Sequence, residues 1–222
     1  YGVWDPTTLV EGTVFGEEAL AYMQTTIASP LREVDGMVIY HSPVMHDYQI
    51  GVDPSIGSED PCHICVVDKE TGEEVANFTG YVPMNVVVQK TFQLATMYSL
   101  KSEPLVVPEV TGVGQAFIEE FKKIWNNIYI REVFNHREQK ESKKLGFYTN
   151  YSTKTQLIEH FRDLMQKKFP KVRDQKTLDE FRTFIYSDEA KNKGAGGQRG
   201  YHDDRVMGKL LAYWKVEYKY LP

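Results

Sequence analysis

The chain has 222 residues, of which 41% are hydrophobic and 26% are charged, so it can bury a sizeable core and has the charge content of an ordinary globular protein. No apolar stretch approaches the ~18 residues that a membrane helix needs, and no secretory signal pattern stands at the start. Two cysteines are too few for a disulfide framework, which favours a reducing compartment and excludes a small disulfide-stabilised secreted fold.

Charge is divided unevenly along the chain, although the net charge is only −5. The first 119 residues hold 4 Lys/Arg and 17 Asp/Glu, whereas residues 120–222 hold 22 and 14. This asymmetry suggests a polyanionic partner on one face and cations held by the other. Two solvated surfaces of opposite charge are the alternative, and charge alone does not decide between them.

The first half of the chain predicts a mixed sheet with crossover helices, an α/β fold. A short helix is expected in residues 16–33, ending near Pro30, and a first strand in residues 36–44. Strands rich in β-branched residues and helices with a 3.6-residue period then alternate along the chain. We expect strands at 48–53, 63–70, 74–82, 104–110 and 128–134, and helices at 85–100 and 112–127.

The second half predicts helices separated by basic, polar segments. Residues 135–150 are charged and are expected to form a loop. A helix is expected at residues 152–169 with Ser152 as its N-cap, and another at residues 201–218. Residues 178–189 fit either a helix or a strand, and residues 191–200 (KNKGAGGQRG) are Gly-rich and basic.

The CxxC pair of Cys62 and Cys65 suggests zinc or thiol redox chemistry, but its context favours two core thiols. The surrounding sequence HICVVD reads as a strand, and positions i and i+3 of a strand point to opposite faces. A second Cys pair is absent, and redox CxxC pairs lie at helix N-termini.

Acidic residues stand where the predicted elements end or begin. Asp53 ends the strand at 48–53, Glu109 closes the strand at 104–110, and Asp203 and Asp204 open the last helix. If the two strands are adjacent and parallel, their acids meet at one edge of the sheet. Carboxylates so close repel each other unless cations neutralise them, and hard oxygen ligands favour Mg²⁺ or Mn²⁺. Two such ions support phosphodiester cleavage.

Each acid also has a simpler interpretation. Asp53 can open a turn before Pro54, Glu109 can be a loop acid, and Asp203 or Asp204 can cap the helix. Singly, these interpretations are favoured. The joint pattern of two acid-ended strands and an acid pair before a helix is more specific.

Three segments that carry these acids resemble the acidic motifs of a known family. GVDPSIG, VVPEVTGVG and GYHDDRVMGKLLA are similar to the motifs of the nuclease domain of viral large terminase subunits, the DNA-packaging motors of tailed phages. GFYTNYSTKTQLIEHFRDLM also resembles the region after that domain's fifth strand. The resemblance covers roughly residues 45–215.

The resemblance implies an RNase H-like mixed β-sheet flanked by helices, and a two-metal endonuclease that uses Mg²⁺ or Mn²⁺ to cut concatemeric double-stranded viral DNA during packaging. Asp53 would bridge two ions, Glu109 would bind one and Asp203 the other. Asp204 would replace or assist Asp203, and Asp60 stands where some members carry an auxiliary acid. The implied location is the host cell cytoplasm, at the viral procapsid.

The family's complete chain also carries an ATPase, which needs a phosphate-binding P-loop, and GxxxxGK[ST] does not occur here. The chain begins without Met. We therefore expect residues 41–222 to be the nuclease domain and residues 1–40 to be a lead-in from an absent ATPase domain. By resemblance, that ATPase domain, the portal and the small terminase are partners.

Basic residues of the second half are candidate DNA contacts, because phosphate contacts position DNA without reading its sequence. They flank the expected loop at 135–150 and the Gly-rich segment, and they are Lys140, Lys143, Lys144, Lys191, Lys193 and Arg199. Mobile solvated loops are an equal alternative.

Other functions remain open at this point. The same fold serves junction resolvases and transposase-like enzymes, and a non-catalytic adaptor that binds DNA or a portal ring would also be basic. An actin- or sugar-kinase-like nucleotide-binding domain is a further alternative, but it needs a second phosphate loop, which we do not find.

Overall fold

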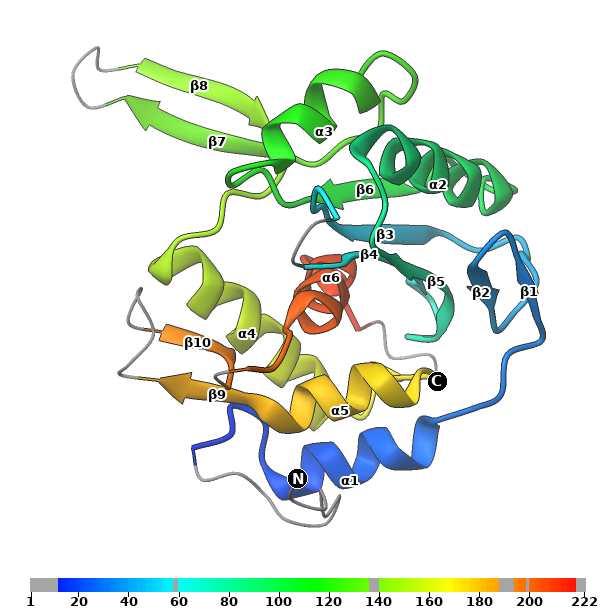
Figure 1. The fold of residues 1–222 in the computed structure, drawn as a ribbon, viewed down its shortest axis with the longest axis vertical. Coiled ribbons are helices and arrows are strands. Elements are labelled where there is room, and N and C mark those ends of the chain that lie inside the picture. The colour runs from blue at the N-terminus through cyan, green and yellow to red at the C-terminus, as the bar shows by residue number, and fades with distance from the viewer. Residues whose placement is uncertain (1–11, 58–59, 136–139, 188–193, 199, 219–222) are drawn as a thin grey trace.

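A six-stranded mixed sheet forms the centre of the molecule (Figure 1). The computed structural model describes residues 12–57, 60–135, 140–187, 194–198 and 200–218. The strand order is β1-β2-β5-β4-β3-β6, and β3 and β6 are parallel while the other neighbours are antiparallel. The strands are β1 (Arg32–Val34), β2 (Met37–Ile39), β3 (Tyr48–Asp53), β4 (Cys62–Asp68), β5 (Glu74–Gly80) and β6 (Leu105–Pro108).

Helices cover both faces of this sheet (Figure 1). One face carries α2 (Met84–Met97) and α3 (Gly114–Phe121). The other face carries α6 (Asp204–Tyr213), against which α4 (Tyr151–Gln166) and α5 (Gln175–Thr183) pack. Helix α1 (Glu17–Thr26) packs in turn on α5. Covered on both faces, β4 is buried at every position, which explains why apolar residues follow one another from Ile64 to Val67 without alternation. The predicted α/β mixed sheet is confirmed.

The two faces of the sheet also place the cysteines. Cys62 belongs to the core beneath α2 and α3, whereas Cys65 belongs to the core beneath α6. Both thiols are free and buried, so the prediction of two core thiols on opposite faces is confirmed. No helix within the described ranges has the length and apolar character needed to cross a membrane.

Two hairpins lie outside the central sheet and project from the same side of the molecule (Figure 1). They are β7 (Ile130–Asn135) with β8 (Lys140–Leu145), and β9 (Phe184–Ser187) with β10 (Gly194–Gly197). The strand expected at 128–134 therefore does not join the central sheet as a full strand; an isolated bridge from Ile128 to Val106 touches β6.

The prediction of loops in residues 135–150 and 191–200 was wrong where these ranges overlap β8 and β10. The reason for β8, KESKKL, is that it pairs through its backbone while Glu141, Lys143 and Lys144 stay exposed, so it leaves no hydrophobic period to detect. Residues 178–189 contain both expected elements, the end of α5 and then β9. Helix α4 is capped by Asn150 rather than Ser152, because Asn150 and Thr153 form a reciprocal capping box.

Part of the segment expected to be a lead-in belongs to the same core. Val14, Phe15 and Met23 are buried against helices of the second half, and β2 pairs with β5. Whether residues 1–40 continue from an ATPase domain stays a prediction.

Two glycines allow helix α6 to lie unusually close to the sheet. A Cβ on Gly51 of β3 would lie 2.1 Å from Gly208 O and 2.3 Å from Ala212 N. A Cβ on Gly208 would lie 2.6 Å from His63 Cδ2 on β4. Real Cβ atoms do not approach so closely, so glycine is required on both sides of this contact.

We predict that Gly51→Ala lowers the free energy of unfolding by at least about 2 kcal/mol, because the methyl group would push α6 off β3. Gly16→Ala is the matched control, since its Cβ would meet nothing within 4 Å, and should change stability by about 0.5 kcal/mol or less. Urea denaturation of both variants measures the difference. Equal stability of the two variants would contradict the close approach.

Candidate metal centre

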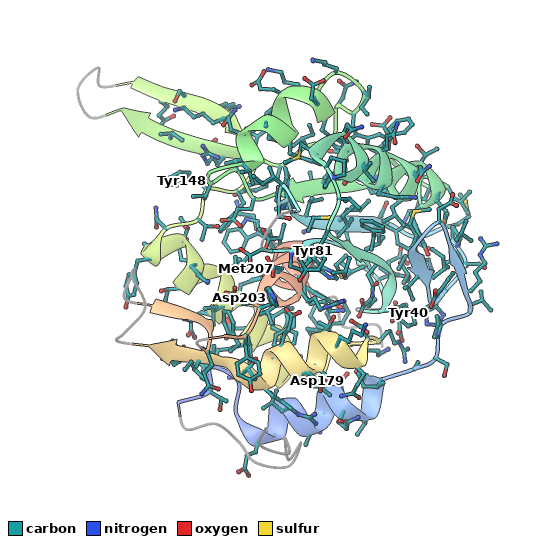
Figure 2. All side chains as sticks on the ribbon, viewed as in Figure 1. Tyr40, Tyr81, Tyr148, Asp179, Asp203 and Met207 are labelled. Carbon is teal, nitrogen blue, oxygen red and sulfur yellow. The ribbon has the colours of Figure 1, made fainter. Side chains whose placement is uncertain are left out.

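Carboxylates from distant parts of the chain meet in one cleft of about 410 Å³. The acids expected at the ends of elements all line it, and so does the expected auxiliary acid. The lining residues are Asp53, Pro54, Ser55, Ile56, Gly57, Asp60, Glu109, Val113, Thr149, Lys154, Asp203, Asp204 and Met207. In Figure 2, Asp203 and Met207 lie near the middle of the molecule, where α6 begins.

Parallel pairing of β3 and β6 brings the first two acids together. Val52 is paired with Pro108, and Glu109 N donates to Val52 O at 2.9 Å. Asp53 and Glu109 therefore follow the last paired residues of two adjacent parallel strands, as the sequence predicted. Strand ends of this kind are where α/β sheets gather chemistry.

The start of α6 supplies the other acids. Asp203 stands at the N-cap position, but its side chain makes no capping hydrogen bond to the helix. It instead accepts from Lys154 Nζ at 3.3 Å. The side chain of Asp203 therefore does not cap the helix, which was its simpler interpretation.

Crowding of these carboxylates shifts their protonation. Burial raises the pKa of Asp53 well above its usual value, and the charge of Glu109, a hydrogen bond to Glu109 and the charges of Asp204 and Asp203 raise it further. Burial, followed by the charges of Asp60 and Asp203, raises the pKa of Asp204 to about 6. The folded chain thus holds carboxylates that are costly to ionise together.

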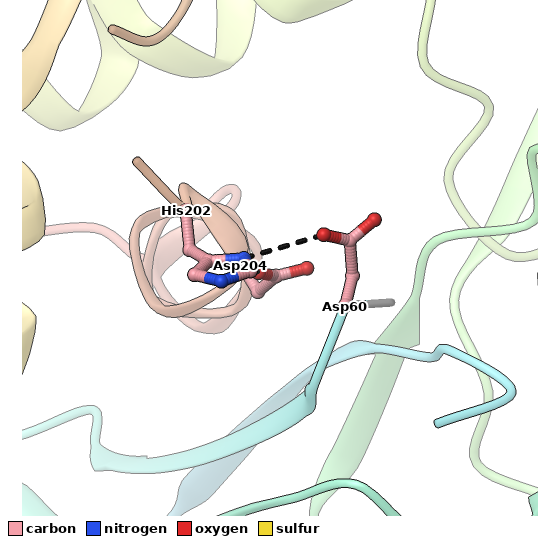
Figure 3. A group of neighbouring side chains, drawn as sticks. All are labelled: Asp60, His202 and Asp204. Atoms are coloured by element: carbon pink, nitrogen blue, oxygen red, sulfur yellow. Dashed lines mark ion pairs between the residues drawn. The ribbon is translucent and has the colours of Figure 1, made fainter. Parts of the chain in front are cut away.

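Asp60 extends the cluster toward solvent and lies beside His202, which precedes the acid pair of α6 (Figure 3). His202 Nδ1 lies 3.2 Å from Asp60 Oδ1 and 3.4 Å from Asp204 Oδ2. One ligand atom from each of these three residues lies within 4.8 Å of the others. From the sequence alone, a helix-flanking structural histidine is the favoured interpretation of His202, and orientation of a water is the alternative.

The donor set of the cleft suits a hard divalent cation. Its ligand atoms are carboxylate oxygens, which Mg²⁺ and Mn²⁺ prefer, with one imidazole at the rim. Thr149 also lines the cleft, and its buried hydroxyl has no hydrogen-bond partner within the part of the chain that the structure describes. Mutual repulsion and an unsatisfied polar atom are both features that a bound cation with its water would relieve.

Ion pairs, partly or fully buried, fix the helix whose start carries Asp203 and Asp204. Arg205 Nη1 lies 2.9 Å from Asp174 Oδ2, and Arg205 Nε lies 3.1 Å from Glu180 Oε1. One turn later, Lys209 Nζ lies 2.7 Å from Glu74 Oε2, and both side chains are fully buried. The start of α6 is therefore tied to α5, and its middle to β5.

The expected DNA-contact residues are only partly described. Lys143 and Lys144 are exposed on β8, and Lys140 begins this strand. Lys191, Lys193 and Arg199 lie outside the described residues. Sequence reasoning missed Lys154 altogether, because nothing in STKTQ distinguishes it from the other lysines of the basic half.

Comparisons with known proteins agree with this fold. No protein-family model and no curated protein matches the chain. Among solved structures, the large terminase nuclease from thermophilic phage G20c is 25% identical, with a TM-score of 0.71 over 93% of this chain and 100% of that chain. The magnesium-bound form of the same nuclease is 26% identical, with a TM-score of 0.72 over 94% of this chain and 100% of that chain. Cobalt- and zinc-bound forms match as well.

The large terminase nuclease domain of Thermus phage P74-26 is 24% identical, with a TM-score of 0.62 over 91% of this chain and 99% of that chain, and supports the fold. The structural neighbours of the chain are thus large terminase nuclease domains, and both the resemblance and the RNase H-like fold are confirmed.

We predict that Asp53→Asn stabilises the metal-free protein by about 1 kcal/mol near pH 8, because the amide removes a buried charge from the repelling cluster. The same variant should lose most of the rise in melting temperature that Mn²⁺ gives the wild-type chain. Thermal and urea denaturation in EDTA and in Mn²⁺ measure both effects.

Asp163→Asn is the matched control, since Asp163 is exposed on α4 and does not line the cleft. It should leave the response to Mn²⁺ intact. If Asp53→Asn destabilises the metal-free protein and keeps the full Mn²⁺ response, the cluster is not a cation site.

Proposed function

We propose that the chain is the nuclease domain of a viral large terminase, a metal-dependent endonuclease that cuts double-stranded viral DNA during genome packaging. The observation that carries this proposal is the convergence of Asp53, Glu109, Asp203 and Asp204 in one cleft. The likeness to the G20c large terminase nuclease, which has been solved with bound magnesium, supports it.

Each acid of the cleft has a proposed role in metal binding. Asp53 feels the charges of Glu109 on one side and of Asp203 and Asp204 at the start of α6 on the other, which fits the role of bridging two ions. Glu109 would hold one ion, Asp203 and Asp204 the other, and Asp60 would assist at the rim. Two Mg²⁺ or Mn²⁺ ions, when bound, supply an activated water and stabilise the leaving oxygen of a phosphodiester.

The wider setting is proposed from the same likeness. The substrate would be concatemeric DNA, cut in the host cell cytoplasm at the viral procapsid. An ATPase domain, the portal and the small terminase would be the partners. The β7–β8 and β9–β10 hairpins, which project from the same side of the molecule (Figure 1), are the proposed surface for duplex DNA. The proposed phosphate contacts are Lys140, Lys143, Lys144, Lys191, Lys193 and Arg199.

We expect Asp53→Ala to abolish Mn²⁺-dependent nicking of plasmid DNA while the variant still folds, because the cleft loses the acid that faces both halves of the cluster. Gel assays of nicking and a thermal melt of the same sample test this. Undiminished nicking by the variant would end the proposal. Preferential cutting of branched over linear duplex would favour a junction resolvase, and failure to bind Mn²⁺ by calorimetry would favour a non-catalytic adaptor.

The double variant Lys143→Ala/Lys144→Ala should weaken DNA binding equally for all sequences. It should reduce the slope of log affinity against log salt by up to about 1.8, because each phosphate contact contributes about 0.9. Fluorescence anisotropy at several salt concentrations, in an Asp53→Ala background that prevents cutting, measures the slope.

Lys122→Ala/Lys123→Ala is the control, because these adjacent exposed lysines follow α3 and pair with Glu119 and Glu120 of that helix. An unchanged slope in the β8 variant would place the DNA elsewhere.

A further inference from the structure

One basic side chain lies among the acids of the cleft. Among the described residues that line it, Lys154 is the one lysine or arginine. Its ammonium Nζ lies 3.3 Å from Asp203 Oδ2, and its side chain is 21% exposed. The positive charge of Lys154 is thus largely covered and lies among carboxylates.

Three elements of the fold hold Lys154 in place. It lies near the start of α4, which the capping box of Asn150 and Thr153 fixes, and its backbone N–H donates to Asn150 O at 2.8 Å. Side chains on a helix lean toward its N-terminus, and in α4 that end borders the cleft. The ammonium also lies 5.3 Å from the ring centroid of the buried Phe184, at the start of β9.

Strand β10 also lies beside the pair of Lys154 and Asp203. A Cβ on Gly196 of β10 would lie 3.6 Å from Asp203 Oδ2 and 4.0 Å from Lys154 Nζ. The backbone of β10 therefore lies close to both charged groups. The ammonium is confined beside the carboxylates instead of being free in solvent, as most surface lysines are.

This placement creates a competition for one carboxylate. Asp203 is a proposed metal ligand, and a divalent ion on the same carboxylate would be repelled by the ammonium. The substrate brings a second acceptor, because the non-bridging oxygens of a phosphodiester accept hydrogen bonds from lysine, which contacts phosphate as a point charge. The two acceptors lie within the same small cleft, so the ammonium can exchange one for the other without leaving it.

We infer that Lys154 is a further catalytic residue of the cleft. Its ammonium pairs with Asp203 before metal binds, and it binds a non-bridging oxygen of the scissile phosphate once a divalent ion has taken that carboxylate. This inference rests on the proposed nuclease function and adds a residue that affects both metal affinity and turnover. A lysine that merely anchored α4 to the start of α6 would act on stability alone.

The test compares Lys154→Met, Lys154→Arg and the control Lys176→Met, which removes an exposed charge of α5 outside the cleft. Titration calorimetry with Mn²⁺, in the absence of DNA, should show about tenfold tighter binding to Lys154→Met and near wild-type binding to the other two. At saturating Mn²⁺, plasmid nicking by Lys154→Met should be at least about tenfold slower. Lys154→Arg, which keeps the charge, should retain part of the rate.

Opposite changes in metal affinity and in nicking rate are the signature that a structural anchor would not give. Unchanged or weaker Mn²⁺ binding by Lys154→Met, or an unchanged nicking rate, overturns the inference. If Lys154→Met does not fold, Lys154→Gln takes its place in the same measurements, and the same results are expected. If Lys154→Met nicks DNA normally while Asp53→Ala does not nick it, the role of Lys154 is overturned but the proposed nuclease function is not. A wild-type chain that binds Mn²⁺ but never nicks DNA overturns the proposed function itself.

Discussion

Direct contact between the backbone of α6 and strand β3 is the constraint on which the cleft depends. Gly51 and Gly208 leave no side chain between the two elements, so the helix axis approaches the sheet more closely than ordinary packing permits. Only at this separation does the start of α6 reach the edge where β3 and β6 end. Asp203 and Asp204 thereby meet Asp53 and Glu109, although about 150 residues of chain separate the end of β3 from α6.

Close contact fixes the distance of α6 from the sheet, and buried charges fix its orientation. Arg205 joins the first turn to Asp174, which also caps α5, and to Glu180. The fully buried pair of Lys209 and Glu74 cannot rotate away without leaving an uncompensated charge in the core, which is strongly destabilising. Such pairs contribute little net stability, but they penalise every alternative placement of the helix. The acids at its start are therefore presented in one arrangement.

The electrostatic character of the cleft follows from this rigidity. Carboxylates held together by a packed helix and a parallel strand pair cannot move apart to lower their repulsion, and the raised pKa of Asp53 and of Asp204 reports that cost. A protein tolerates such a cost where function requires it. Cations are the natural counterpart, and the chain already places one of its own, Lys154, against Asp203. Similarity to metal-bound terminase nucleases points to the same conclusion from an independent direction.

The sequence by itself determined the elements that bury apolar side chains and the acids that end or open them. The apolar runs of β3, β4 and β6, the period of α6 and the positions of Asp53, Glu109, Asp203 and Asp204 are all local patterns. The charged strand β8 escaped detection because it buries little, and the β-branched residues at 128–134 suggested a sheet strand that became a separate hairpin. Which lysine enters the cleft, and that His202 joins Asp60, was decided by tertiary structure alone. The reason is physical: periodicity reports whether a segment is covered, whereas only the packing of distant segments decides what covers it.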